Sequence, residues 1–197
     1  AFDELAAAPL TAATCEAWLA DWTRIAYLVY EAFARINVAT TINTEDADAK
    51  KRLFHFLEHI IPPVQAADQV LKAKLLATGL EPAGFEVPLR NLRAEVEVFR
   101  TENLPLMTEE GKLANQFDEI KGAQTVVWEG LEIPLPQLNP HLQSPDRATR
   151  ERAWRLGQTR NLKDRDALNE LWKQFLSLRV RMAQNAGFAD YRAYRWK

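Results

Sequence analysis

Apolar residues recur at every third or fourth position over most of the chain, which is the period of an amphipathic α-helix. The pattern predicts a long helix over Cys15–Val38, a second that starts near Thr44, and a third over Pro63–Gly79. Proline is tolerated in the first turn of a helix but not inside it, so Pro62-Pro63 predicts a kinked helical hairpin or a bent rod. The first apolar stripe consists of Trp18, Trp22, Ile25, Val29, Phe33 and Ile36.

Four more helices are predicted further along the chain. They cover Pro88–Phe99, the segment after Thr108 as far as Gly122, the segment from Ser144 to about Arg160, and a last full helix that stops before Gly187. Thr108 and Ser144 are residue types that cap a helix N-terminus. The last full helix has the clearest stripe, formed by Leu168, Leu171, Trp172, Phe175, Leu178 and Met182.

The period changes only between Gln124 and Leu135. The segment TVVWEGLEIPL places β-branched and aromatic residues on both sides of Glu129-Gly130, which predicts an antiparallel hairpin with a positive φ angle at Gly130. Pro134 restricts the second strand to an edge position. The predicted fold class is therefore mainly α: a multi-helix bundle of long kinked helices with one small antiparallel β-hairpin.

Composition indicates a globular protein without a disulfide or a membrane helix. The 197 residues are 47% hydrophobic and 26% charged, which suits a globular chain. Cys15 is the only cysteine, so no internal disulfide forms, and a reducing compartment is indicated. No segment has the about 18 uncharged apolar residues of a membrane helix. We therefore expect a cytoplasmic protein that does not enter a membrane.

The net charge of -2 conceals an uneven distribution. The segment 146–197 contains 13 Lys and Arg against 6 Asp and Glu, or +7, and residues 1–145 carry -9. The basic part could form a nucleic-acid face, but its arginines follow amphipathic helices, which favours a solvated or partner-facing surface. We therefore expect no nucleic-acid partner.

One local motif has the residue types of a metal site. His55-Phe56-Leu57-Glu58-His59 has the HxxEH order of the inverted zinc peptidases, and two histidines four residues apart share a helix face. Glu129 or Glu132 would have to supply the third ligand, and a glutamate on a hairpin is weak support. The alternative, two histidines on a helix surface, is favoured.

Other residue clusters have simpler explanations. The acidic groups Asp3-Glu4, Glu45-Asp46-Asp48 and Glu109-Glu110 lie at predicted helix starts, where the helix dipole favours carboxylates, so capping is preferred over acid-base catalysis. No phosphate-binding glycine loop or nucleophile elbow occurs. Four tryptophans at helical spacings favour core packing over base stacking: Trp18, Trp22, Trp154 and Trp172.

Two longer segments carry a family resemblance. NLPLMTEEGKLANQFDEIKGAQTVVWEGLEIPLPQLNPHLQSPDRATRERAW, followed by LNELWKQFLSLRVRMAQNAGFADYRAY, resembles the oligoendopeptidase F branch of the thimet-type zinc oligopeptidases. Several features come in the family's order along the chain: the Lys121-Gly122 break, the hairpin, Ser144-Pro145-Asp146-Arg147 and the turn before Tyr191. Asn43-Thr44-Glu45-Asp46 and Ile60-Ile61-Pro62-Pro63 extend the resemblance over most of Trp18–Trp196.

The resemblance implies a function in which this chain is one part. The family hydrolyses short peptides with one zinc ion, held by two histidines of an HExxH helix and a later glutamate. The sequence contains no HExxH, whose place in the family pattern lies beyond Lys197, so no catalytic, cofactor-binding or metal residue carries over. We therefore expect the N-terminal lobe of a longer peptidase, inactive alone, with short peptides and the C-terminal catalytic portion as its partners.

The same resemblance divides the lobe 1–197 into three segments. Residues 1–122 form helical hairpins, 123–143 the β-hairpin and a loop, and 144–197 helices that continue toward the catalytic lobe. Tyr191, Tyr194 and Trp196 lie close to the end of the sequence in a segment that needs apolar cover. A free-standing helical binding or scaffold module is the alternative, and an HExxH segment in the same reading frame would decide against it.

Overall fold

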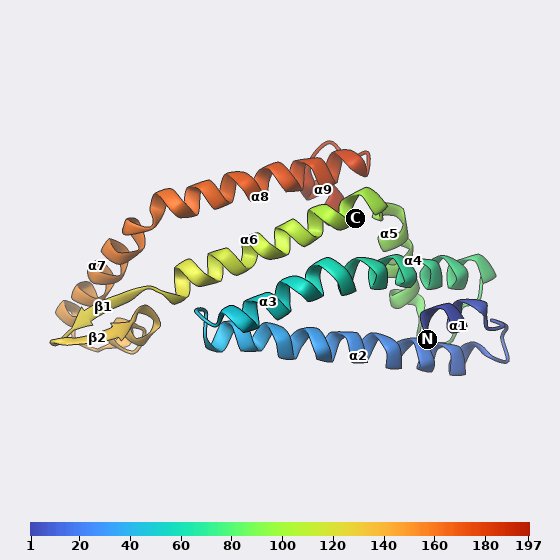
Figure 1. Ribbon diagram of the computed structural model, residues 1–197, viewed down its shortest axis with the longest axis horizontal. Helices are drawn as coiled ribbons and strands as arrows, with labels where there is room; N and C mark the ends of the chain where they lie inside the picture. The colour runs from blue at the N-terminus through green and yellow to red at the C-terminus, as the bar shows by residue number, and fades with distance from the viewer.

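The computed structural model describes residues 1–197, and helices dominate it (Figure 1). The predicted fold class is confirmed: the chain is a mainly α protein with one two-stranded sheet. No helix is both long enough and apolar enough to cross a membrane. The α-helices are α1 (Phe2–Ala7), α2 (Cys15–Ile42), α3 (Ala47–His55), α4 (Ile61–Thr78), α5 (Glu86–Val98), α6 (Leu104–Gly122), α7 (Arg147–Lys163), α8 (Arg165–Asn185) and α9 (Tyr191–Arg195).

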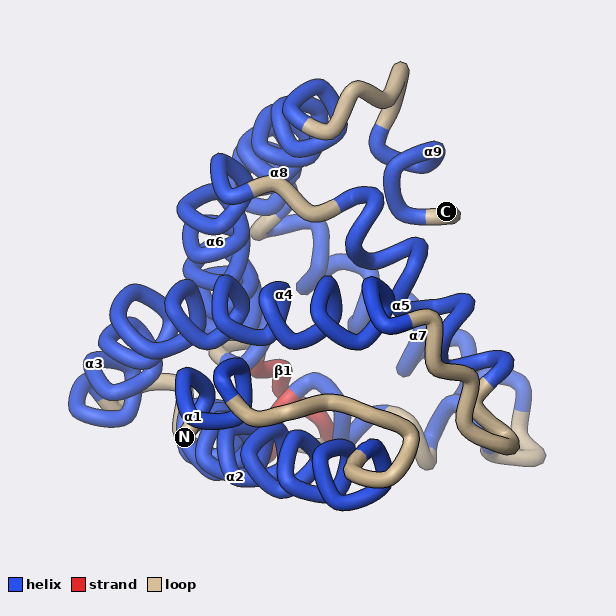
Figure 2. The backbone as a smooth tube through the Cα atoms, turned by 90° about the vertical axis from the view of Figure 1, so that its right-hand side faces the viewer, coloured by secondary structure: helices blue, strands red, loops and turns tan.

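The long helices lie side by side in an elongated arrangement. Figure 1 shows α2, then α3 with α4, then α6, then α8 in succession, and Figure 2 shows α2, α4 and α6 at successive levels. The largest buried cluster lies where α1, α2, α4 and α5 meet. A second lies among α6, α8 and α9, and a third under the hairpin and α7. The first cluster contains Leu5, Cys15, Trp18, Leu71, Leu75 and Leu89.

The prediction that the prolines open a helix ending at Gly79 is confirmed, but no break separates this helix from the one before it. A π-helical turn, η1 (Phe56–Ile60), joins α3 to α4, and the prolines occupy the first turn of α4. The N–H of Ile61 donates to Phe56 O, and Pro62 has no N–H. The carbonyl of Leu57 therefore loses its helical donor, and the Thr108 hydroxyl donates to it instead at 3.0 Å. In place of the predicted kink, the chain has a π-turn whose free carbonyl is hydrogen-bonded by a side chain of α6.

Three helix starts differ from the prediction. Asp46 caps α3 by accepting from Ala49 N, so Thr44 is not the cap. Asp146 caps α7 by accepting from Thr149 N, which places the cap two residues after Ser144. Helix α6 begins at Leu104, so Thr108 lies inside it, and α1 has no counterpart among the predicted helices.

The predicted hairpin is confirmed. Strand β1 (Thr125–Trp128) pairs antiparallel with β2 (Leu131–Pro134). The turn residues Glu129 and Gly130 have φ angles of 52° and 85°, the left-handed pair that a two-residue hairpin requires. Trp128 holds the hairpin against α7, because its ring lies 4.5 Å from the His141 ring and 4.0 Å from the Arg152 guanidinium of α7. Two 3-10 turns, η3 (Leu135–Leu138) and η4 (His141–Gln143), continue to α7, and η2 (Thr101–Asn103) precedes α6.

Candidate functional site

The two histidines of the HxxEH motif do lie together. His55 ends α3 and His59 lies in η1, both side chains are exposed, and their ring centroids are 4.7 Å apart. The carboxylate of Glu58 contacts α6, with Oε1 lying 2.6 Å from Lys112 Nζ, while its Oε2 lies 3.8 Å from His59 Nε2. The hydrogen bond from Lys112 holds the pKa of Glu58 below its usual value. Glu58 is therefore a partner of Lys112 in an α6 contact.

The glutamates considered as third ligands lie elsewhere. Glu129 pairs with Arg152 at 3.1 Å, and Glu132 accepts from the Thr125 hydroxyl, both on the hairpin. The motif contacts the N-terminal half of α6, whereas the hairpin follows the C-terminal end of that helix (Figure 1). No three His, Cys, Asp or Glu side chains are grouped so that they could hold a metal ion. The residues present therefore do not fit the zinc centre of an inverted-motif peptidase.

The acidic clusters have structural partners. Asp46 is a cap, and Asp3 and Glu4 lie in the first turn of α1. Glu109 and Glu110 lie inside α6 rather than at its start. Glu109 pairs with Lys112 at 2.8 Å, and Glu110 pairs with an arginine of α8.

An apolar groove lies between α6 and α8, which lie side by side in Figure 1. Its volume is about 590 Å³. Large side chains line it without filling it: Trp172 is 58% exposed and Phe117 is 44% exposed. The lining residues are Met107, Glu110, Gly111, Ala114, Phe117, Asp118, Leu168, Leu171, Trp172, Phe175 and Arg179.

One end of this α6–α8 groove carries a fixed charge pair. Arg179 Nε donates to Glu110 Oε1 at 2.7 Å, so the two helices are linked across the groove. The Arg179 guanidinium also lies 5.0 Å from the centre of the Phe175 ring and 5.4 Å from that of Tyr191. Burial, together with the Glu110 charge, raises the pKa of the Tyr191 hydroxyl. The groove thus combines an apolar floor with a charged, aromatic end.

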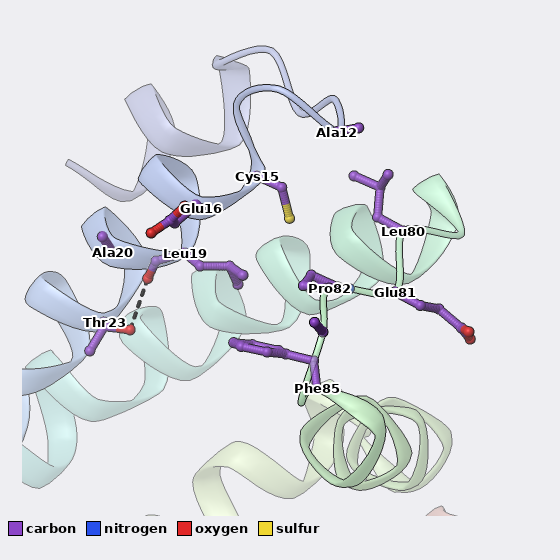
Figure 3. A pocket seen from close by; sticks show the side chains of 11 residues that line it. Ala12, Cys15, Glu16, Leu19, Ala20, Thr23, Leu80, Glu81, Pro82 and Phe85 are labelled. Carbon is purple, nitrogen blue, oxygen red and sulfur yellow. Dashed lines mark hydrogen bonds between the residues drawn. The ribbon is translucent and has the colours of Figure 1, made fainter.

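A second hollow, of about 670 Å³, lies between the start of α2 and the segment 80–85 (Figure 3). Cys15, Leu19, Leu80 and Phe85 face it from two sides, and Glu81 extends away from it (Figure 3). The one hydrogen bond drawn there joins Thr23 to the Leu19 carbonyl within α2. Glu16 and Thr23 of α2 also line this hollow, but the carboxylate on its other side, Glu81, is paired with Arg93.

The tryptophans divide into two classes that the sequence did not distinguish. Trp18 is 3% exposed and donates to Leu5 O, and Trp22 donates to Asp68, as core packing requires. The core prediction is wrong for Trp154 and Trp172, which are 55% and 58% exposed. Near the end of the sequence, Tyr194 is buried by α6 and α8, whereas Trp196 is 81% exposed.

Solved structures share this arrangement of helices. A protein described as an oligoendopeptidase F matches 99% of the chain with a TM-score of 0.78 and 22% identity. PZ peptidase A, solved with an inhibitor, matches 91% with a TM-score of 0.73 and 23% identity. The fold is that of part of an oligoendopeptidase. An oligoendopeptidase F from Bacillus anthracis also matches 91%, with a TM-score of 0.65 and 19% identity.

The oligoendopeptidase likeness covers this chain almost entirely but the other proteins only in part. The chain spans 35%, 31% and 34% of those three chains, or about a third of each. No family model and no curated protein matches the sequence. The resemblance noted in the sequence is therefore confirmed at the level of the fold.

Proposed function

We propose that this chain is the N-terminal lobe of a zinc-dependent oligopeptidase, forming one wall of a channel for short unfolded peptides. The observation that carries the proposal is the match of nearly the whole chain to about a third of each oligoendopeptidase structure. The family order of the sequence segments supports the same assignment. The catalytic portion is then a separate part of the longer polypeptide.

The extent of exposed surface supports a lobe that packs against further protein. The accessible surface of the chain is 12799 Å². A compact monomer of 22.5 kDa exposes about 9,500 Å² by the usual size scaling. The excess is larger than the about 1,000 to 2,500 Å² that each partner contributes to a large permanent interface, so the chain has ample surface for further protein to cover. The α6–α8 groove is an apolar part of that surface, and we assign it to the wall of the channel.

Zinc would be held by the catalytic portion and not by this lobe. When bound, the ion would polarise water and the scissile carbonyl. The three histidines of this chain are His55, His59 and His141, and His141 is stacked on Trp128 in the hairpin contact. We assign no catalytic or metal-binding role to any of them. With one buried free cysteine, Cys15, the lobe suits a reducing, cytoplasmic setting.

The direct test compares the chain alone with the chain joined to its catalytic portion. We expect the purified chain to contain no stoichiometric zinc by elemental analysis and to leave a quenched fluorescent peptide uncleaved. We expect stoichiometric zinc and peptide cleavage when the complete polypeptide is expressed. At the genetic level, a longer coding sequence with an HExxH segment in the same frame would decide for the peptidase lobe.

Two results would contradict the proposal. Stoichiometric zinc in the isolated chain, lost together with peptidase activity in His59→Ala but retained in His141→Ala, would favour the inverted motif. A coding sequence without any HExxH segment would instead favour the helical binding or scaffold module.

A further inference from the structure

The N-terminal half of α7 presents a tryptophan and several arginines on one exposed face. Arg147, Arg150 and Trp154 are three or four residues apart and therefore neighbours on the helix surface. With Leu142 of η4 they line a hollow of about 590 Å³. Helix α7 lies beside the hairpin at one end of the molecule (Figure 1). The α7 hollow, as we call it, is also lined by Glu151 and Arg155.

The charges of the α7 hollow are not all neutralised within the chain. Arg155 pairs with Glu151 at 2.8 Å, and on the other side of the helix Arg152 pairs with Glu129. Arg147 and Arg150, in contrast, form no direct ion pair, although the Arg150 charge lies near enough to Asp146 to help lower the pKa of that carboxyl. The hollow therefore keeps two positive charges that a ligand can reach.

Arg150 is held in place by the backbone. Its Nη1 donates to Ser144 O at 2.6 Å and to Pro145 O at 2.9 Å, and the residue is half-buried. These bonds fix the guanidinium and leave its Nη2 and Nε donors free. A guanidinium fixed in this way loses little conformational entropy when it binds a carboxylate in two-point geometry.

Trp154 supplies an apolar surface beside the guanidinium groups. Its 55% exposure contradicts the helical pattern, which predicts a core position, and such conflicts concentrate at functional sites. Tryptophan and arginine are also the residues most enriched at the energetic centres of protein interfaces. The combination fits a ligand with carboxylates next to a large apolar side chain.

We propose that the α7 hollow binds an acidic peptide segment that carries an apolar side chain, with Arg147 and Arg150 receiving its carboxylates and Trp154 its apolar group. A nucleic acid fits less well. The hollow contains the carboxylate of Glu151, and two free cations are far fewer than the about 6–10 phosphate contacts of a typical nucleic-acid site. This proposal is independent of the peptidase function, because the α7 hollow and the α6–α8 groove share no residue.

The test is fluorescence anisotropy of a labelled peptide of alternating glutamate and leucine titrated with this chain. We expect saturable binding that weakens between about 50 mM and 300 mM salt, because exposed charges are screened. Arg147→Glu should weaken binding about tenfold or more by replacing attraction with repulsion, and Trp154→Ala should weaken it comparably. Both side chains are exposed, so neither variant should alter folding, which circular dichroism checks.

Matched controls separate a site from general charge attraction. Arg24→Glu reverses a charge on α2, where Arg24 is exposed and paired with Asp21, and should leave the affinity unchanged. A lysine-leucine peptide should not bind. Four outcomes would overturn the proposal: no saturable binding, equal weakening by Arg24→Glu, tighter binding of an oligonucleotide than of the peptide, or loss of the site in the longer protein because another segment covers it.

Discussion

The π-turn between α3 and α4 makes the most specific energetic prediction, because one side chain completes its hydrogen bonding. The Leu57 carbonyl has no helical donor, since the Ile61 N–H donates to Phe56 O and Pro62 has none. The Thr108 hydroxyl lies 3.0 Å from this oxygen and 3.3 Å from the Leu104 carbonyl of its own helix, so its single proton favours the shorter bond to Leu57. Both Leu57 and Thr108 are buried. In Thr108→Val the side chain keeps nearly the same shape and the carbonyl stays buried without a partner.

We expect Thr108→Val to lower the free energy of unfolding by about 1–3 kcal/mol, the cost of a buried polar group left unpaired. For a chain of this length, each kcal/mol lowers the melting temperature by about 2–4 °C. Urea unfolding followed by circular dichroism measures the change. Thr23→Val is the matched control: its hydroxyl bonds to Leu19 O on an exposed helix face, so its effect should stay within about 0.5 kcal/mol.

A double-mutant cycle tests the cause as well as the size of the effect. Pro62→Ala restores an N–H at the position where the π-turn lacks one, close to the free Leu57 carbonyl. In that background Thr108→Val should cost less, by about 1 kcal/mol, because the carbonyl has another donor. If Thr108→Val costs the same in both backgrounds and no more than Thr23→Val, the hydroxyl does not support the π-turn and the reasoning is refuted.

Three further predictions concern other parts of the molecule. Gly130→Ala should lower the free energy of unfolding by about 1 kcal/mol in urea titration, because φ is 85° there; no loss would contradict the strain argument. The hydrogen bond from Gln124, and then the Arg160 charge, hold the pKa of Asp164 below its ordinary value. The folded pKa of Asp164 lies below the unfolded one, so this stabilisation is complete above about pH 4 and is lost as pH falls through the folded pKa. Gln124→Leu should therefore make the urea midpoint depend less on pH in the acid range. An unchanged dependence of the midpoint on pH would refute this role of Gln124. Under the proposed peptidase function, Trp172→Ala in the complete polypeptide should raise KM with little change in kcat, because the α6–α8 groove would contact bound peptide. An unchanged KM would remove the groove from the channel.

Local patterns predicted the helices and the hairpin because those elements are determined by spacing within one segment. The turn Glu129-Gly130 and the αL glycine at Gly79, which follows α4, are examples in which one residue type fixes the backbone. The π-turn could not be predicted in the same way. It depends on Thr108, which is 51 residues from Leu57 in the sequence and reaches it only through the packing of α6.

The candidate sites depend even more on contacts between distant segments, which spacing within one segment does not predict. Spacing placed His55 and His59 on one face correctly, but a metal site also needs a third ligand, and the position of Glu129 depends on the whole fold. Periodicity likewise placed Trp172 on the apolar face of α8 without indicating how far α6 covers that face. A helical pattern gives the direction of a side chain, whereas exposure depends on how the partner helix lies.

The distribution of buried residues explains why Trp154 and Trp172 remain exposed in a chain with so much apolar sequence. The buried clusters are small and separate: one joins α1, α2, α4 and α5, one lies among α6, α8 and α9, and one lies beneath the hairpin and α7. A single central core would draw the apolar stripes of all the long helices inward, but an elongated row of helices gives each helix neighbours on only part of its surface. The apolar stripe of α8 therefore extends past its contact with α6, and the surface that remains is what a second structural unit or a bound peptide can cover.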